Sequence, residues 1–236
     1  MQQRLVTYDT RAGDWWSERG VFSRLADLTG PRFEFFDRHL TNWTGLDVLV
    51  VGCGGGYVTE HLVRRGCSVW GVDGSPESVR VAAEHAVAEG MAIDYRVAAP
   101  TELPFDDRKF DVVLCLDLLE HVDDASAVVG EIARVLQPGG HFLFGTHNRT
   151  WLSRVVVWWE RMRGDLPSHD WSRFLKPGEL RKLLASHGLM DVSLAGMGPR
   201  EPFPRKRDGG ARLELGGSLQ TTYLGTCRAP PGPPAV

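Results

Sequence analysis

The chain has 236 residues, of which 27 are lysine or arginine and 30 are aspartate or glutamate, so its formal net charge is −3. This length fits one domain with a full hydrophobic core, and the charge balance excludes the strongly basic surface typical of nucleic-acid-binding domains. The cysteines form no CxxC pair, no secretion signal is visible at the N-terminus and no apolar run is long enough to cross a bilayer; we therefore expect a cytoplasmic protein, either free or peripheral to a membrane.

Short apolar runs alternate with helix-like stretches between about residues 46 and 146. The sequence predicts five strands in this core, at 46–51, 68–72, 93–97, 110–115 and 141–146. Between them it predicts three helices. The first begins within residues 59–65, the second covers 76–89, and the third covers 125–136 and ends at a turn at 138–140. This alternation indicates an α/β fold with a doubly wound, Rossmann-like sheet, which binds ligands at the carboxyl ends of its strands.

Two segments flank this core. Residues 1–45 are rich in aromatic side chains, and we expect them to form a helical cap over one end of the sheet. Residues 147–178 are a lid or insertion that precedes a helix at 177–186. Strands at 190–196 and 218–227 complete a mostly parallel, seven-stranded sheet with a terminal antiparallel strand. Residues 1–228 are thus expected to form one domain, followed by a disordered, proline-rich tail at 229–236.

The strongest local signal is the run GCGGG at residues 52–56, which follows the first strand and precedes a helix. Glycines at this point let the backbone approach a ligand closely, with amide N–H groups turned towards it. Tyr57 stands where a dinucleotide fingerprint needs its third glycine. Asp73 closes the second strand, where a carboxylate accepts hydrogen bonds from both hydroxyls of a ribose. Together these features predict a nucleoside site; the alternative is a tight turn beside a surface aspartate.

The glycine run and Asp73 resemble those of the S-adenosylmethionine (SAM)-dependent methyltransferases. The segment after the fourth strand, Leu116-Asp117-Leu118-Leu119-Glu120-His121-Val122, narrows the resemblance to the ubiquinone-biosynthesis O-methyltransferases, which methylate polyprenyl catechols. Flanking motifs of that family are matched by Trp15-Trp16, Pro31-Arg32, Asn148-Arg149, His169-Asp170, Phe174 and Lys176-Pro177. The resemblance spans roughly residues 8–190 and fades towards the C-terminus.

By position, the resemblance implies contacts to SAM from Arg32, Gly52, Gly54, Asp73 and Leu116. Arg32 would pair with the methionine carboxylate, a contact suited to a guanidinium. The resemblance also implies that Asp117, Glu120 and His121 hold a magnesium ion. On a helical turn these three side chains would face one point. The alternative is that the acids favour a helix N-terminus and that His121 is simply packed or solvated.

Methyl transfer from a sulfonium is an in-line displacement, so the acceptor oxygen must be aligned with the methyl carbon and made anionic. A phenol with a pKa of about 10 is mostly protonated at neutral pH and needs a base or a cation. A metal ion would chelate a catechol; without one, His121 or His147 is the candidate base. We take Glu120 and His121 as the predicted catalytic residues. The Trp15-Trp16 pair either caps the sulfonium by cation–π contact or packs in the lid.

The insertion carries apolar residues at helical spacing between positions 151 and 163, with arginines among them. An amphipathic helix with tryptophan and arginine is the form expected at a bilayer surface. The resemblance likewise implies that this region approaches membrane lipid. A lid helix over the substrate pocket and a homodimer face are the alternatives.

The sequence therefore predicts a SAM-dependent O-methyltransferase that acts on a phenol, catechol or hydroquinone, prenylated or quinone-like compounds included, and that has no nucleic-acid partner. One alternative is methylation of an isoprenoid or aromatic carbon, in which Glu120 or His121 removes a proton. Another is a cofactor-binding subunit without catalysis. This last alternative draws on two departures from the family pattern, because Val50 and Ala99 stand where acidic residues usually face the cofactor.

Overall fold

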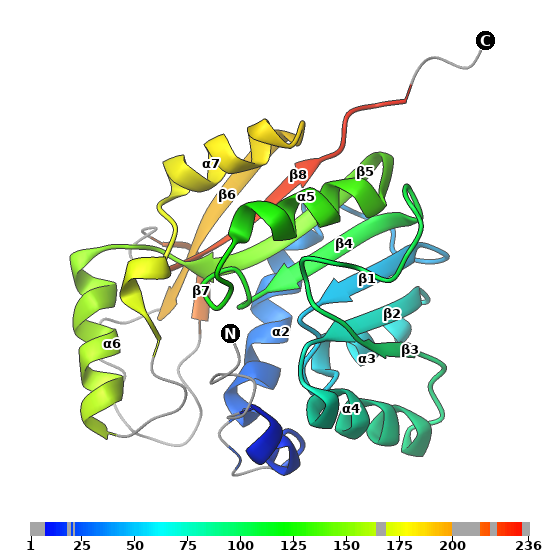
Figure 1. Ribbon diagram of the computed structural model, residues 1–236, viewed down its shortest axis with the longest axis horizontal. Helices are drawn as coiled ribbons and strands as arrows, with labels where there is room; N and C mark the ends of the chain where they lie inside the picture. The colour runs from blue at the N-terminus through cyan, green and yellow to red at the C-terminus, as the bar shows by residue number, and fades with distance from the viewer. Residues whose placement is uncertain are drawn as a thin grey trace.

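The computed structural model is built on one mixed sheet in the order β3-β2-β1-β4-β5-β8-β6-β7 (Figure 1). It describes residues 8–17, 20, 22–163, 169–199, 213–217 and 221–232. The strands are β1 (Asp47–Val51), β2 (Ser68–Asp73), β3 (Asp94–Val97), β4 (Phe110–Leu116), β5 (Leu136–His147), β6 (Met190–Pro199), β7 (Leu213–Gly217) and β8 (Thr222–Arg228). The helices are α2 (Ser23–Phe36), α3 (Tyr57–Val63), α4 (Pro76–Ala88), α5 (Ala125–Val135), α6 (Trp151–Arg163) and α7 (Pro177–Ser186), with short 3-10 turns η1 (Ala12–Asp14) and η2 (Trp171–Arg173).

The first five strands pair in parallel, and the C-terminal strands are antiparallel. β8 lies between β5 and β6 and runs against both. The predicted doubly wound, mostly parallel α/β fold is confirmed. The sheet has one strand more than predicted, since β6 continues to Pro199 and its far end pairs with β7. Residues 200–212, which link these two strands, lie outside the described residues.

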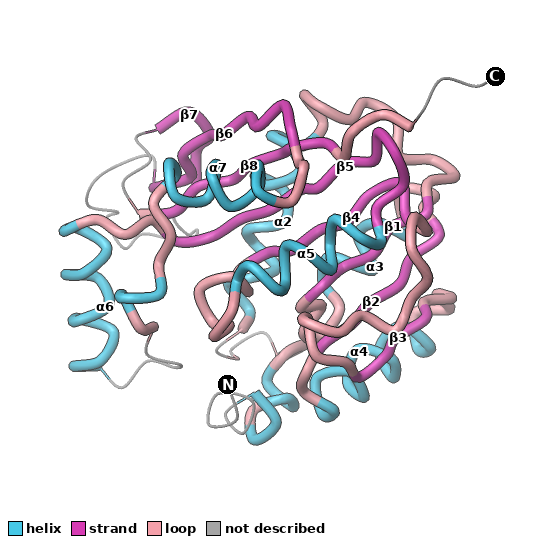
Figure 2. Tube along the Cα trace, turned by 45° about the horizontal axis from the view of Figure 1, so that its top comes forward, coloured by secondary structure: helices cyan, strands magenta, loops and turns pink. Residues whose placement is uncertain are grey.

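Helices cover both faces of the parallel part of the sheet (Figures 1 and 2). Leu49 and Val51 of β1 pack with α5 and α7 on one face, whereas Val48 and Val50 pack with α2 and α3 on the other. A strand buried on both faces reads as a continuous apolar run, which is why residues 47–51 show no polar alternation. The strand order reverses between β1 and β4, so a crevice is expected at their carboxyl ends.

Several element boundaries differ from the prediction for local reasons. α3 begins at Tyr57 because Gly56, with φ 98°, forms its N-cap. β5 begins at Leu136 and includes the predicted turn at 138–140, where the pairing with β4 shifts register. The N–H of Ala229 donates to Gly140 O at 2.9 Å, so the chain stays bound to β5 beyond the predicted start of the tail. Residues 233–236 of that tail lie outside the described residues.

The two flanking segments frame the carboxyl edge of the sheet. η1 contacts α4 and belongs to the predicted N-terminal cap. α6 and η2 contact each other, and α6 stands away from the sheet (Figure 1). Among the residues that the structure describes, no helix combines the length and apolar character that crossing a membrane requires.

Candidate cofactor and acceptor site

A pocket opens at the carboxyl ends of β1, β2 and β4. It brings together every residue that the sequence assigned to the cofactor, namely Arg32, Gly52, Gly54, Asp73 and Leu116. Its remaining wall comes from the N-terminal cap, through Tyr8, Trp15 and Leu25, and from the segment after β4, through Asp117, Leu118, His121 and Val122. One cavity therefore joins the residues predicted to bind the nucleoside to the turn in which the catalytic residues were predicted.

Asp73 organises the nucleoside end of this pocket. Its Oδ2 accepts a hydrogen bond from the N–H of Gly54, and its Oδ1 accepts one from the N–H of Ser75, both at 2.9 Å. A carboxylate has about four acceptor positions, so it can also accept from the hydroxyls of a ribose. Gly54 has φ 52°, a left-handed backbone that glycine adopts without strain. Burial raises the pKa of Asp73 above its ordinary value of 3.8, and the hydrogen bonds from Ser75 and Gly54 oppose that shift.

The tryptophan pair closes the pocket over the glycine loop. The Trp15 indole N–H donates to Ser78 Oγ at 3.1 Å, and that of Trp16 donates to the carbonyl of Gly55 at 2.8 Å. Trp15 lines the pocket, whereas Trp16 stacks on His85 with ring centroids 3.5 Å apart. The two residues therefore have different roles, since one faces the cavity and the other ties the cap to α4.

Arg32 is held at the other end of the pocket, beneath Asp117. The guanidinium is 3% exposed and its Nη2 forms an ion pair with Asp117 Oδ2. Its Nε–H is buried and makes no hydrogen bond to any part of the chain that the structure describes. This donor is thus available to an anion, as the predicted contact with a methionine carboxylate requires. Burial by itself would raise the pKa of Asp117, but the charges of Arg32 and His147 outweigh it and lower the pKa below 3.8.

The turn after β4 separates the three predicted magnesium ligands. Residues 117–121 form a turn and not the expected helical one, because Asp117 adopts φ 53°. Asp117 and His121 line the cofactor pocket, whereas Glu120 is fully buried and faces β5. In the described residues, Asp117, Glu120 and His121 do not form a group with all donor atoms within 4.8 Å of one another. This arrangement does not fit the predicted magnesium site, which needs all three side chains to face one point.

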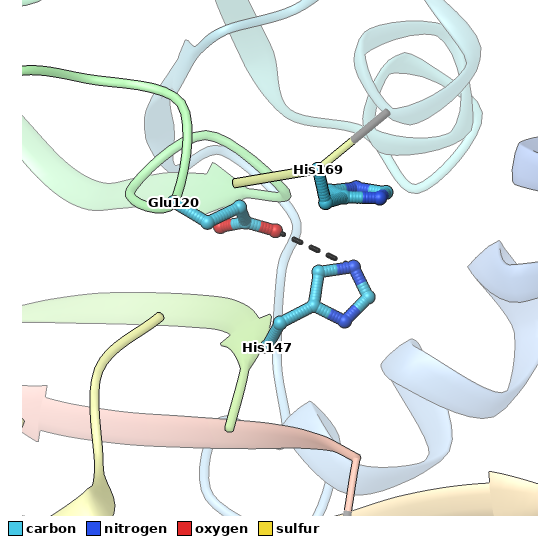
Figure 3. Close-up of side chains that lie close together, drawn as sticks. All are labelled: Glu120, His147 and His169. Atoms are coloured by element: carbon cyan, nitrogen blue, oxygen red, sulfur yellow. Dashed lines mark ion pairs between the residues drawn. The ribbon is translucent and has the colours of Figure 1, made fainter. Parts of the chain in front are cut away.

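Glu120 instead meets two histidines, His147 and His169 (Figure 3). Thr146 Oγ1 donates to Glu120 Oε2 at 2.8 Å, and Glu120 Oε1 lies 3.7 Å from His147 Nε2. Burial raises the pKa of Glu120 above 4.5, and the nearby His147 opposes the shift. The sequence suggested His147 only as an alternative base and His169 only as part of a family motif. The proximity of Glu120 and His147 follows from the parallel pairing of β4 with β5, which brings the ends of both strands to one edge, whereas His169 comes from the insertion.

Both departures from the family pattern leave the pocket wall apolar. Val50 lines the pocket where an acid was expected, and Pro100 lines it beside Ala99. Glu102, the nearest acid to that position in the sequence, is exposed and lies outside the pocket lining. Contact with the cofactor's amino group at Val50, and with its adenine beside Pro100, would thus depend on shape and apolar contact.

Comparisons with known proteins agree with this geometry. Residues 49–144 match the family model described as a methyltransferase domain. The ubiquinone biosynthesis O-methyltransferase of Idiomarina loihiensis is 37% identical over 201 residues, which are 83% of this chain and 82% of that protein. The protein of the same name from Chromobacterium violaceum is 38% identical over 79% of this chain and 82% of its own length.

Solved structures support the fold. A SAM-dependent methyltransferase from Thermotoga maritima, described as a possible histamine N-methyltransferase, has a TM-score of 0.69 and covers 97% of this chain and 99% of its own. At 17% identity this likeness shows the fold alone. The sequence identity to the curated relatives goes further: the chain is an S-adenosylmethionine-dependent methyltransferase and belongs to the family of the ubiquinone biosynthesis O-methyltransferases.

Proposed function

We propose that this protein transfers the methyl group of SAM to a hydroxyl of a phenol, catechol or hydroquinone of the quinone-related class, prenylated compounds included. The observation that carries the proposal is the continuity of the pocket, whose lining includes Asp73 and Gly54 together with Leu118 and His121. The names of the curated relatives, at 37% and 38% identity, support oxygen as the acceptor atom.

The residues of the cofactor end orient the methyl donor. Asp73 accepts the ribose hydroxyls, and the buried Arg32 takes the methionine carboxylate through its Nε–H and its charge. Holding the molecule at both ends restricts the sulfonium between them. Such positioning converts a bimolecular displacement into an effectively unimolecular one, worth up to about 7–11 kcal/mol for a well-aligned pair.

The acceptor end removes a proton and excludes water. His121 lines the pocket with an imidazole, the side chain best suited to accept a phenolic proton at neutral pH. Glu120, the second residue predicted to be catalytic, lies outside the pocket lining and faces the imidazole of His147 from a fully buried position, so in the proposal it acts through His147. Leu118, Val122 and Tyr8 complete an apolar wall that suits an aromatic ring and strengthens electrostatic interactions at the reacting oxygen.

Turnover with methyl-labelled SAM on a panel of catechols and hydroquinones tests the proposal. The expected product carries the label on oxygen, which the chemical shift of the methyl carbon distinguishes from carbon attachment. A label on carbon would favour the alternative of C-methylation. Cofactor binding without turnover across the panel would favour a non-catalytic subunit.

The proposal includes contact with a membrane surface through residues 151–163. Trp151, Trp158, Trp159 and Met162 of α6 are each at least 57% exposed, whereas Ser153 and Val157 are buried. The outward face of this helix is therefore its apolar one, with Arg154 beside it, which suits a bilayer interface. A prenylated acceptor dissolved in lipid would reach the pocket from that side.

Co-sedimentation with vesicles of anionic phospholipid tests this contact. The protein is expected to pellet with vesicles, and the double variant Trp158→Glu/Trp159→Glu to remain in solution. Val87→Glu, which alters a side chain of similar exposure on α4, is the matched control. Equal sedimentation of the double variant and the parent protein would count against the membrane, and a dimer that dissociates in the same variant would assign the face to self-association.

A further inference from the structure

One cluster of side chains is not explained by cofactor binding. Glu120, His147 and His169 each direct a ligand atom into one small region, with all three atoms within 4.8 Å of one another. Figure 3 shows the Glu120 carboxylate and the His147 imidazole turned towards each other, with the His169 ring beside them. Glu120 follows β4, His147 ends β5, and His169 precedes η2, so three separate segments supply the cluster.

The spacing within the cluster differs from that of a direct hydrogen bond. Glu120 Oε1 and His147 Nε2 are 3.7 Å apart, whereas a charge-assisted N–H···O bond is about 2.7–2.9 Å long. Two donors on one tetrahedral ion, with bonds of about 2.1 Å, are separated by roughly 3.4 Å. The observed separation is closer to that of two ligands of a shared cation.

Neighbouring groups orient two of the ligands. Thr146 Oγ1 donates to Glu120 Oε2, which leaves Oε1 directed at the cluster. The Nδ1 of His147 lies 3.2 Å from Thr222 Oγ1 on β8, and in the tautomer that donates from Nδ1 to this hydroxyl the Nε2 lone pair is directed at the cluster. The His147 ring also stacks on Phe174, with centroids 4.9 Å apart. Metal-binding histidines are commonly fixed in this way through their second nitrogen.

We infer that Glu120, His147 and His169 form a site for a divalent transition-metal ion, of the class that includes zinc, manganese, iron(II) and cobalt. Two imidazoles and one carboxylate suit these ions, whereas magnesium prefers oxygen ligands and retains several waters. Three protein ligands leave at least one coordination position open, as catalytic metal sites do. This ligand set shares only Glu120 with the set implied by sequence resemblance.

The role of the site in catalysis rests on the proposed function, but the binding of metal does not. His121 lines the cofactor pocket and its ring also stacks on His169, with centroids 5.1 Å apart, so the cluster adjoins the acceptor end. When bound there, a cation would supply positive charge that favours the anionic form of a phenolic oxygen. The alternative is that Glu120 and His147 form an acid–base pair that needs no metal.

Cobalt(II) and zinc titrations of the whole, tag-free protein test the inference. After dialysis against a chelator, the protein is expected to bind one equivalent of zinc by calorimetry and to develop cobalt absorption in the visible range. His147→Gln and His169→Gln should each weaken zinc binding at least about tenfold, and Thr222→Val about 10–100-fold as an outer-shell change. Asp117→Asn and His121→Gln are the matched controls and should retain the metal.

Three results would overturn the inference. They are the absence of stoichiometric metal binding, loss of binding in the Asp117 and His121 variants alone, and unchanged binding in both the His147 and His169 variants. Calorimetry with S-adenosylhomocysteine on the same samples distinguishes failure of the metal site from failure of the proposed function. A protein that binds the cofactor product but no metal refutes only the metal site, and one that binds metal but no nucleoside refutes the methyltransferase assignment.

Discussion

Replacing Asp73 with asparagine tests the nucleoside end of the pocket with minimal change in shape. In the parent protein both carboxylate oxygens accept backbone N–H groups, those of Gly54 and Ser75, at 2.9 Å. An asparagine has one acceptor oxygen, so its NH2 group must face one of these donors. The variant therefore leaves a buried N–H without a partner and loses one acceptor for the ribose.

The magnitude follows from these two losses. A buried donor left unsatisfied costs about 1–3 kcal/mol, which lowers the free energy of unfolding and loosens the glycine loop. Losing a hydrogen bond to a charged acceptor costs about 1.5–3 kcal/mol of binding free energy. At 1.4 kcal/mol for each factor of ten, the dissociation constant of S-adenosylhomocysteine should rise by about 10–150-fold.

Isothermal titration calorimetry with S-adenosylhomocysteine at neutral pH measures this change directly. Asp94→Asn is the matched control, because Asp94 is a partly exposed aspartate on the adjacent strand β3 and lies outside the pocket. Its dissociation constant should equal that of the parent protein. A dissociation constant for Asp73→Asn within about twofold of the parent value would refute the assignment of Asp73 to the ribose.

Three further predictions concern other parts of the structure. Arg32→Lys should weaken S-adenosylhomocysteine binding by about 10–150-fold. The binding of methylthioadenosine, which lacks the carboxylate, should be unaffected, and equal weakening of both ligands would contradict the role of Arg32. Gly55→Ala places a Cβ 2.3 Å from Trp15 Cγ, and this overpacking should lower the free energy of unfolding, measured in urea, by about 1–3 kcal/mol. The effects of Gly55→Ala and Trp15→Ala should not add in the double variant, and additivity would refute the clash. Burial lowers the pKa of His61 from 6.5 to about 4, so between these two pH values the unfolded chain binds a proton that the folded protein does not. The free energy of unfolding should therefore fall by about 1–3 kcal/mol as the pH drops from 6.5 to 4. His61→Phe should reduce this pH dependence of stability, and a pH profile parallel to that of the parent protein would exclude His61 as its cause.

The parts of the site that sequence analysis predicted depend on short-range constraints. The glycine run lies between a buried strand and a helix, and the close approach of Asp73 Oδ2 to the Gly54 N–H needs only that β1 and β2 be parallel neighbours. Apolar runs such as residues 48–51 can be recognised in the sequence because both faces of the strand are covered. The glycine run and the apolar strand can therefore both be recognised from the sequence, without knowledge of the tertiary structure.

The direction of the side chains after β4 was not predictable in the same way. A helical turn would have aimed Asp117, Glu120 and His121 at one point. Asp117 instead adopts φ 53°, a left-handed conformation that aspartate tolerates better than most residues. The ion pair with the buried Arg32, 85 positions earlier in the sequence, fits this conformation. Nothing within the local segment indicates such a distant partner.

The position of His147 beside Glu120 could also have been predicted from the sequence. Once β4 and β5 are recognised as parallel neighbours, Leu116 pairs with Gly145, so residues that follow the two strands must share one edge of the sheet. That rule brings His147 towards Glu120 without any coordinates. His169 is different, because it lies in an insertion and no strand pairing places it beside the cluster, where its ring contacts His147 and Phe174. Topology alone therefore predicts two residues of this cluster, and the position of the third depends on how the insertion folds.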